Sequence, residues 1–417
     1  MMNQDNLAST ENQMLPKGYK KTDLGLIPED WTIKSFEQVT SKIGDGIHST
    51  PIYNCTGEYY FINGNNLVAG SILIDGETKK ISSKEFRKYK QILSGKTILL
   101  SINGTIGNRA FYNAEPVLLG KSAAFLNING ECSVPYIYYV LGSKRTLDQF
   151  NDGLTGSTIK NLGLGTIRNT LIPMPILAEQ EKIATALSDT DALISELEKL
   201  IEKKQAIKTA TMQQLLTGKT RLPEFALRED GTPKGYKDSE LGQIPEDWEA
   251  IRIGSALTIK HGKSQKLVES NDGKFPILAT GGQIGWAKEY LYNKPSVLIG
   301  RKGTINKPRF IDQPFWSVDT LFYSEINEKY CAKFLFYKFC RIDWNNYNEA
   351  SGVPSLNAKT IENVLISISS LDEQKQIVKC LHELDTEIIQ MVDKLRKLID
   401  IKKGMMQELL TGKTRLV

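Results

Sequence analysis

The sequence has few of the residues that disulfide frameworks, zinc sites and histidine-based catalysis require. Its 417 residues include five cysteines, an odd number, and no CxxC pair. Neither a disulfide framework nor a structural zinc site is therefore expected, and a cytoplasmic location fits this cysteine usage. The three histidines, His48, His261 and His382, are scattered without a recognisable cysteine or serine partner. Histidine-assisted nucleophilic catalysis is therefore not predicted.

Long apolar runs and cofactor-binding loops are also missing. No run approaches the roughly eighteen apolar residues of a membrane span, and the polar N-terminus does not have the order of a secretory signal. The TGKT stretches at 217–220 and 411–414 resemble the end of a phosphate-binding loop, but glutamine stands at 213 and 407, where that loop needs glycine. No glycine-rich loop follows a strand to hold S-adenosylmethionine or a dinucleotide. The sequence therefore predicts a protein without catalysis of its own.

Positive charge is present in two separate blocks. Residues 32–177 hold 15 Lys and Arg against 10 Asp and Glu, and residues 249–370 hold 16 against 11. The remaining segments are neutral or acidic. Two basic blocks indicate two sites for a polyanion such as nucleic acid, while an excess of five is also common on a solvated surface.

The chain repeats itself. The motif GYKKTDLGLIPEDW at 18–31 recurs as GYKDSELGQIPEDW at 235–248, and LLTGKTRL at 215–222 recurs unchanged at 409–416. Glu179-Gln180 likewise recurs as Glu373-Gln374. The two repeats are alike at their flanks and unlike in their basic blocks. This pattern is expected when a common frame holds two domains of different specificity.

Two proline-free stretches have the heptad spacing of long helices. The predicted seam consists of Ile183, Leu187, Ile194, Leu197 and Ile201 in the first helix and Ile377, Leu381, Leu384, Ile388, Leu395 and Leu398 in the second. Leu193, Leu200 and Ile207 widen the first apolar stripe. Gly218 and Gly412 stand where a helix C-cap is expected.

A helix of about 40 residues is roughly 60 Å long, and its seam must be buried against a partner. A coiled-coil homodimer would bury it. We expect instead that the two helices pair with each other, antiparallel, within one chain, which gives the molecule an internal pseudo-twofold repeat.

The basic blocks have the pattern of compact α+β domains. Each contains a strand-turn-strand stretch, at 96–107 and 295–305, and an amphipathic helical piece, at 134–145 and 329–341. The predicted fold is therefore α+β, with two globular α/β domains joined by two long helices. The predicted order is an N-terminal tail at 1–15, a first domain at 16–177, a long helical region at 178–222, a linker at 223–234, a second domain at 235–370 and a C-terminal long helix at 371–417.

Together, the repeated GYK…IPEDW motifs, the two basic blocks and the helices that begin at Glu-Gln and end in LLTGKTRL resemble the specificity subunit of a Type I restriction–modification enzyme. The resemblance covers residues 16–417. It implies that each basic block is a target recognition domain for one half of a bipartite DNA sequence. It also implies that the helices space these domains and dock two modification (methyltransferase) subunits, which restriction subunits join. S-adenosylmethionine, ATP and Mg would then bind only to partner subunits.

The resemblance extends to short motifs inside the blocks. GDGIHSTP at 44–51 is similar to the GDGxHxTP opening of some recognition domains, whereas the second block opens with KHGKS at 260–264 and resembles a different group. Both blocks contain a later GTI element, at 104–106 and 303–305.

Residue type suggests the part that each side chain plays on DNA. Arginine can bridge O6 and N7 of guanine, asparagine can bridge N6 and N7 of adenine, and lysine suits phosphate contacts. The first-domain candidates are His48, Ser49, Thr50, Lys84, Arg87, Lys88, Lys90, Asn103, Thr105, Asn108, Arg109, Lys121, Ser157, Thr158 and Lys160. The second-domain candidates are Lys260, His261, Lys263, Ser264, Lys266, Arg301, Lys302, Thr304, Lys307 and Arg309.

Two other functions remain open from the sequence. The chain could itself be a nuclease or methyltransferase, which would show turnover by the isolated protein. It could instead be a coiled-coil adaptor whose basic domains bind proteins, which would show no sequence-selective retention of DNA.

Overall fold

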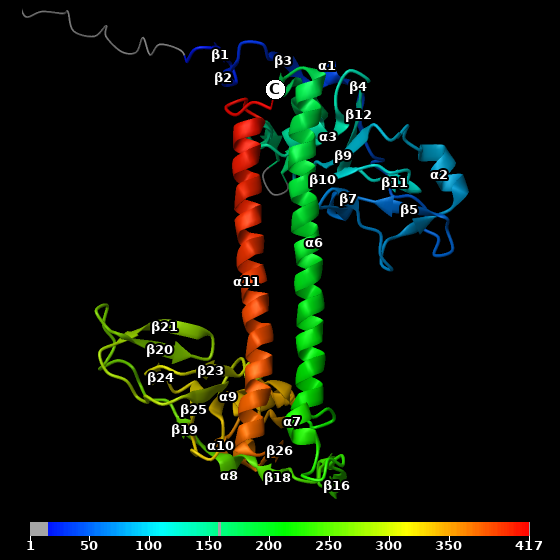
Figure 1. Cartoon of the computed structure of the whole chain (residues 1–417). Helices are drawn as coiled ribbons and strands as arrows, with labels where there is room; N and C mark the ends of the chain where they lie inside the picture. The colour runs from blue at the N-terminus through cyan, green and yellow to red at the C-terminus, as the bar shows by residue number, and fades with distance from the viewer. Residues whose placement is uncertain (1–15, 157–159, 417) are drawn as a thin grey trace, which may run out of the picture. The chain divides into compact units, whose positions relative to one another are not determined.

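The computed structural model describes residues 16–156 and 160–416. The chain divides into two compact units, one formed by residues 1–197 with 394–417 and the other by residues 198–393. Each unit contains one α+β domain and one half of each of two long helices, α6 (Leu177–Leu215) and α11 (Leu371–Leu409) (Figure 1). The predicted α+β fold, with two domains and two long helices, is confirmed. The predicted N-terminal tail lies outside the described residues.

The first domain is built on two sheets, one four-stranded and antiparallel with the order β10-β9-β12-β4, the other three-stranded with the order β11-β5-β8. Its strands are β1 (Tyr19–Thr22), β2 (Gly25–Pro28), β3 (Thr32–Ser35), β4 (Thr40–Asp45), β5 (Tyr59–Ile62), β6 (Leu67–Val68), β7 (Ser71–Ile72), β8 (Lys80–Ile81), β9 (Thr97–Ser101), β10 (Arg109–Phe111), β11 (Val117–Leu119), β12 (Ala123–Ile128), β13 (Leu154–Thr155), β14 (Asn161–Leu162) and β15 (Leu171–Met174). Its helices are α1 (Phe36–Val39), α2 (Ser83–Tyr89), α3 (Val134–Leu141), α4 (Lys144–Asp152) and α5 (Leu164–Asn169).

The second domain repeats this topology. Its four-stranded sheet has the order β19-β25-β22-β23, and its three-stranded sheet has the order β21-β20-β24. Its strands are β16 (Tyr236–Ser239), β17 (Gly242–Pro245), β18 (Glu249–Arg252), β19 (Leu257–His261), β20 (Phe275–Ala279), β21 (Gly282–Ala287), β22 (Ser296–Gly300), β23 (Arg309–Ile311), β24 (Trp316–Ser317), β25 (Leu321–Ile326) and β26 (Leu365–Ile368). Its helices are α7 (Pro223–Ala226), α8 (Ile253–Ala256), α9 (Ala332–Arg341) and α10 (Ala358–Asn363).

The central strands follow directly from the sequence. Every residue of β9 (TILLS) and of β22 (SVLIG) is buried, as expected for strands covered on both faces. The short strands β10 and β23 then pair antiparallel with them. The first strand of each predicted strand-turn-strand stretch is therefore confirmed, whereas the second strand was placed wrongly, because β10 and β23 begin only after residues 107 and 305, where the predicted stretches end.

The long helices run antiparallel to each other inside each unit. In the first unit, Thr190 of α6 contacts Met405 of α11, and Asp191 forms an ion pair with Lys402. In the second unit, Lys204 pairs with Glu387 at 2.6 Å and Lys208 pairs with Asp385. In both units the residue numbers rise along one helix as they fall along the other. The pairing is within one chain, as expected from the sequence.

The predicted seam residues differ in burial. Six are buried and five are half-buried, and both kinds occur near the middle of α6. The buried ones are Ile183, Leu187, Leu197, Ile201, Ile377 and Leu381, and the half-buried ones are Ile194, Leu384, Ile388, Leu395 and Leu398. Leu193, Leu200 and Ile207, which were expected to widen the stripe, are instead exposed.

In the first unit, the repeated flanking motifs meet each other. Glu179 is buried, accepts a hydrogen bond from the Trp31 indole at 3.0 Å, and pairs with Arg415 at 2.7 Å. Arg415 also binds Asp30 at 2.7 Å. The IPEDW motif of the first repeat therefore holds the LLTGKTRL end of the second repeat.

The second unit has the reciprocal arrangement. Glu373 accepts from the Trp248 indole at 2.8 Å and pairs with Arg221 at 2.7 Å, and Arg221 also binds Asp247 at 2.8 Å. Here the IPEDW motif of the second repeat holds the LLTGKTRL end of the first. Buried charges are tolerated when they are paired and hydrogen-bonded, so the recurrence of these motifs has a structural cause.

Candidate nucleic-acid interface

Four segments of the first domain converge on a pocket of about 540 Å³. They are the end of β4 with the turn after it, the loop after β9, Lys121 before β12, and residues 161–164 from β14 to the start of α5. The pocket is lined by Asp45, His48, Ile102, Asn103, Gly104, Lys121, Asn161, Leu162, Gly163 and Leu164. Three residues predicted to bind DNA, His48, Asn103 and Lys121, are therefore brought together, although they lie far apart in the sequence.

Polar contacts fix the side chains of this pocket. The His48 side chain is 73% exposed, and its Nε2 lies 2.7 Å from Oδ2 of Asp45. The Asn103 amide donates to the Lys121 carbonyl at 3.3 Å. The pocket thus presents an imidazole, a carboxamide and an ammonium group, which together can meet both donors and acceptors on base edges.

Backbone constraints explain Gly46 of the GDGIHSTP motif and Gly104 of the loop after β9. The Ile47 amide donates to the Leu119 carbonyl at 2.8 Å, which draws the turn against the neighbouring strand. A Cβ at Gly46 would lie 2.2 Å from that same carbonyl oxygen. Gly104 has φ +73° in the loop after β9, a conformation that favours glycine. These glycines shape the loops rather than reading DNA.

The second domain gathers a different set of side chains at the corresponding end of its sheet. Nη1 of Arg301 lies 2.8 Å from both carboxylate oxygens of Asp319. His261 packs edge-on against Phe322 with ring centroids 4.9 Å apart. Lys302 and Thr304 are exposed beside Arg301. The predicted residues Arg301, Lys302, Thr304 and His261 therefore sit on strand ends and loops that hydrogen-bond to one another.

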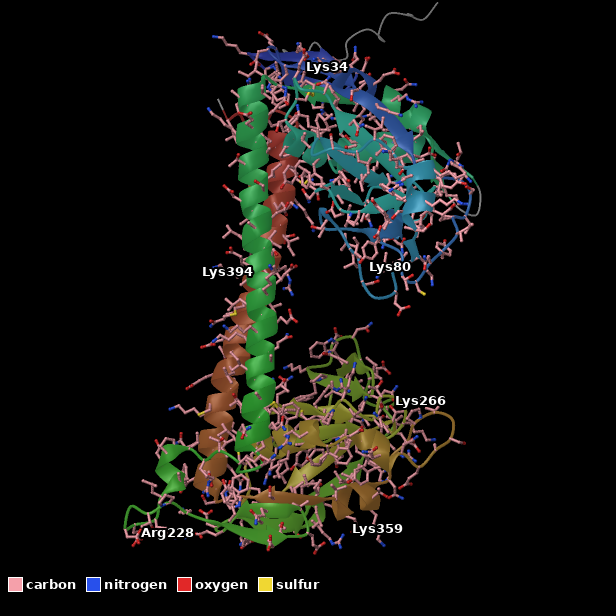
Figure 2. All side chains as sticks on the ribbon, turned by 90° about the vertical axis from the view of Figure 1, so that its right-hand side faces the viewer. Lys34, Lys80, Arg228, Lys266, Lys359 and Lys394 are labelled. Carbon is pink, nitrogen blue, oxygen red and sulfur yellow. The ribbon has the colours of Figure 1, made fainter. Side chains whose placement is uncertain are left out.

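Several predicted cations are free to approach a phosphate backbone. Lys84, Arg87, Lys88 and Lys90 are exposed on α2 or directly after it. Lys263, Lys266 and Lys307 are exposed in the second domain. Figure 2 labels Lys266 on the loop between β19 and β20, on the side of the domain away from the long helices. Lys88 lies over the ring of Tyr89 with its Nζ 4.6 Å from the ring centroid. Exposed cations on such surface positions suit phosphate contact better than base readout.

The remaining predicted residues are placed as follows. Ser49, Thr50, Thr105, Lys160 and Ser264 are exposed, and Asn108 and Lys260 are half-buried. Ser157 and Thr158 lie outside the described residues.

Arg109 corrects one prediction. Its guanidinium stacks over the Tyr138 ring at 4.5 Å, and a Cβ at Gly142 would lie 2.0 Å from its Cζ. Burial lowers the pKa of this guanidinium. Arg109 therefore packs inside the first domain and is not available to read a base.

Arg309 is also more constrained than predicted. Its Nη2 donates to the carbonyls of Ala279 and Thr280, and burial lowers the pKa of the guanidinium. The Arg309 guanidinium is thus hydrogen-bonded to two backbone carbonyls. It therefore stabilises the loop after β20 and does not project from the surface toward DNA.

Sequence reasoning missed Asp45 and Asp319. Asp45 lies inside the quoted GDGIHSTP motif, but an acidic residue is not an obvious choice for a DNA-facing surface. Asp319 has no signal in the sequence, because only the fold brings it beside Arg301.

The described residues contain neither a membrane-spanning helix nor a cluster of metal ligands. No helix there is long and apolar enough to cross a membrane. No group of three or more His, Cys, Asp or Glu residues in the same part of the chain could hold a metal ion.

Comparison with known proteins gives one consistent result. The profile of the family described as "Type I restriction modification DNA specificity domain" matches residues 28–209 and 245–400. The chain is 25% identical to the "Type I restriction enzyme MjaVIII specificity subunit" of Methanocaldococcus jannaschii, over 94% of each chain. It is also 25% identical to the MjaIX specificity subunit of the same organism, over 95% of this chain and 96% of that one. The crystal structure of a Type-I restriction-modification system S subunit from M. genitalium superposes with a TM-score of 0.60 and 20% identity, over 91% of this chain and 96% of that chain, and so shares the fold.

Proposed function

Because the chain belongs to the Type I restriction–modification DNA specificity family, we propose that each of its two domains reads one half of a bipartite DNA target. The observation that carries this proposal is the repeated domain. Both domains have the same sheet order, and both place polar and basic loops at the same sheet ends, but the side chains differ. Two domains with one backbone plan and different surfaces suit two different half-sites.

Within each domain, we assign readout and positioning to different residues. The side chains of His48, Asn103 and Arg301 are held by polar contacts, and Lys302 is exposed beside Arg301, which suits contact with base edges in the major groove. The exposed cations on and directly after α2, with Lys263, Lys266 and Lys307, suit phosphates, which add affinity without sequence information.

The partners follow from the same family. We propose that two modification subunits dock on the long helices and that restriction subunits join them. Leu193, Leu200 and Ile207 support this docking, because a spacing of seven places them on one face of α6 and each is 40–54% exposed. We assign S-adenosylmethionine, ATP and Mg to those partners, and no catalytic step to this chain. The antiparallel helices would set the number of base pairs that lie unread between the two half-sites. Because the complex acts on DNA, we also propose a cytoplasmic location.

The proposal is tested by mapping methylated adenines genome-wide in a host that carries this chain with its modification partner. We expect methylation at one bipartite sequence with a fixed gap. The purified complex should retain DNA that carries this sequence, and its affinity should fall about 10³-fold or more between 50 and 200 mM salt if each domain makes several phosphate contacts.

Two results would contradict the proposal. Turnover by the isolated chain, supplied with Mg and S-adenosylmethionine, would identify an enzyme. Retention of DNA that ignores sequence, in the presence of the modification partner, would favour an adaptor with basic domains.

A further inference from the structure

Backbone hydrogen bonds define which positions of the two domains are equivalent. In the sheet of the first domain Asp45 lies opposite Ala124, and in the second His261 lies opposite Phe322. Two residues later, the Ile47 amide donates to the Leu119 carbonyl and the Lys263 amide donates to the Ser317 carbonyl, both at 2.8 Å. The turn after β4 and the turn after β19 therefore have the same path.

The loops after β9 and β22 match in the same way. The amides of Ile102 and Arg301 donate to the carbonyls of Ser122 and Thr320, each at 2.9 Å. Lys121 precedes the first of these acceptors, and Asp319 precedes the second. Asn103 bridges to Asn161, and Lys302 bridges to Ser355.

Six positions at this end of the domain are thus equivalent by backbone register. In the first domain they are Asp45, His48, Ile102, Asn103, Lys121 and Asn161. In the second domain, in the same order, they are His261, Ser264, Arg301, Lys302, Asp319 and Ser355.

All six positions differ between the domains, whereas the frame around them does not. Gly46 corresponds to Gly262, and a Cβ at either would lie 2.2 or 2.1 Å from a carbonyl oxygen of the next strand. Gly104 corresponds to Gly303, with φ +73° and +89°. The glycines that shape the loops are retained, and the side chains at the six positions are replaced. In the first domain Ile102 is buried, and the other five side chains are exposed or half-buried.

The two carboxylates in this set need an explanation on a surface that faces DNA. An exposed carboxylate repels phosphate, so Asp45 and Asp319 would weaken a surface that served only to bind the backbone. Each is instead paired with a cation or a ring nitrogen, Asp319 with Arg301 and Asp45 with His48, at 2.8 and 2.7 Å. Such pairing fixes the direction of a reading group, and a carboxylate can itself accept from N4 of cytosine.

We propose that these positions, apart from Ile102, which is 3% exposed and packs in the core of the first unit, are the specificity-determining set of each domain. Arg301 reads a guanine through O6 and N7, and Asp319 acts as its positioning residue. In the other domain, His48 and Asn103 read the base edges, and Asp45 positions His48. This inference rests on the proposed function and deepens it, because it names the residues that distinguish the two half-sites.

The test compares methylation patterns of the full complex with its modification partner on a randomised DNA library. In Asp319→Asn the positioning charge is lost at nearly constant shape, so discrimination should fall about tenfold or more at one base pair of one half-site. The other half-site and the gap should be unchanged. Asp45→Asn should reduce discrimination at one base pair of the half-site read by the first domain, and should leave the other half-site and the gap unchanged. A matched control is Glu246→Gln, which breaks the carboxylate–arginine pair with Arg228 at 2.7 Å near the interdomain linker (Figure 2) and should change neither half-site.

Arg301→Lys separates base readout from phosphate contact. Lysine keeps the charge but loses the planar fork, so a phosphate contact would survive and a bidentate guanine contact would not. We expect the guanine preference to be lost while the half-site read by the first domain is kept. Each variant must copurify with the modification partner and melt within a few degrees of wild type, which shows that it has folded.

The outcomes distinguish this inference from the function on which it rests. If the wild-type complex methylates no bipartite sequence, the proposed function fails. If wild type methylates a bipartite sequence and folded Asp319→Asn, Asp45→Asn and Arg301→Lys leave both half-sites unchanged, the specificity set is wrong and the function stands.

Discussion

Lys338 is a buried lysine of the second unit, and only 6% of the residue is exposed. Its Nζ donates to the Leu216 carbonyl at 2.5 Å and to the Ser367 hydroxyl at 2.9 Å. The ring centroids of Trp248 and Phe334 each lie 5.2 Å away. Burial, with a smaller contribution from the charge of Arg341, lowers the pKa of Lys338 to about 7. The lysine therefore provides a hydrogen bond to the Leu216 carbonyl at the end of α6, but its charged form is destabilised because the ammonium group is removed from water.

This pKa predicts how stability depends on pH. A lysine in an unfolded chain has a pKa near 10.4, so between about pH 7 and 10 the unfolded chain binds more protons than the folded one. The free energy of unfolding should therefore rise with pH in this window, by up to about 1.4 kcal/mol per pH unit. Below pH 7 the cost of burying the charge is fully present. Calorimetric unfolding between pH 7 and 9.5 should show the rise in wild type and a flatter profile in Lys338→Met.

The matched control is Lys333→Met on the same helix, where the lysine is only half-buried. This variant should keep the pH dependence of wild type. A Lys338→Met profile as steep as that of wild type would contradict the assignment.

The ends of the long helices depend on two glycines. Gly218 and Gly412 both have φ +72°, and a Cβ at these positions would lie 2.3 Å from Pro245 and 2.5 Å from Pro28. Gly218→Ala and Gly412→Ala should each destabilise the protein by about 1–3 kcal/mol, through the left-handed backbone and this close approach. Gly404 lies inside α11 with nothing within 4 Å of an added Cβ, so Gly404→Ala should stabilise by about 0.5–1 kcal/mol. Denaturant unfolding of the three variants measures these changes in the free energy of unfolding. A change of the same sign for Gly218→Ala and Gly404→Ala would contradict the prediction.

The elements could be predicted from the sequence because their signals are local. Heptad spacing predicted α6 and α11, and Gly218 and Gly412 stand just past their ends, with the positive φ of a C-cap. Buried β-type runs predicted β9 and β22. Leu193, Leu200 and Ile207 were predicted to widen the buried stripe of α6 but are exposed. Periodicity shows that a helix face is apolar, but it does not show which element, if any, covers that face.

The candidate interface could be predicted only in part. Residue type and the GDGIHSTP resemblance led to His48, but the sequence does not show that the Arg109 guanidinium turns inward onto Tyr138. The Arg301–Asp319 pair was missed because it joins two loops through the register of β22 and β25. Charge composition therefore locates a DNA-binding domain, whereas tertiary register decides which of its side chains can read a base.

Each of the two units is completed by an exchange between the two sequence repeats. The IPEDW motif at 27–31 holds the C-terminal LLTGKTRL, and the IPEDW motif at 244–248 holds the copy at 215–222. Tyr19 and Tyr236 repeat this exchange, since their hydroxyls donate to the carbonyls of Gly412 and Gly218 at 2.9 and 3.1 Å. Because the two octapeptides are identical, either could occupy either site.

This exchange predicts the behaviour of one repeat alone. A fragment of residues 16–222 contains the site of the first unit but lacks the C-terminal octapeptide that fills it. Its own octapeptide is identical, and Lys208 stands 194 positions before Lys402, the partner of Asp191. We therefore expect two copies to form a twofold dimer in which each Arg221 reaches Asp30 and Glu179 of the other copy. Light scattering should give twice the monomer mass.

Arg221→Ala is the decisive variant of this fragment, because Arg221 would take the position that Arg415 has in the intact chain. Removing it leaves Glu179 buried and unpaired in the dimer, a cost of about 3–5 kcal/mol, so the dimer should dissociate at micromolar concentration while the domain remains folded. In the intact chain Arg221 serves only the second unit, so the same substitution should leave the protein monomeric. A wild-type fragment that stays monomeric at high concentration would show that octapeptide identity is not sufficient for the exchange.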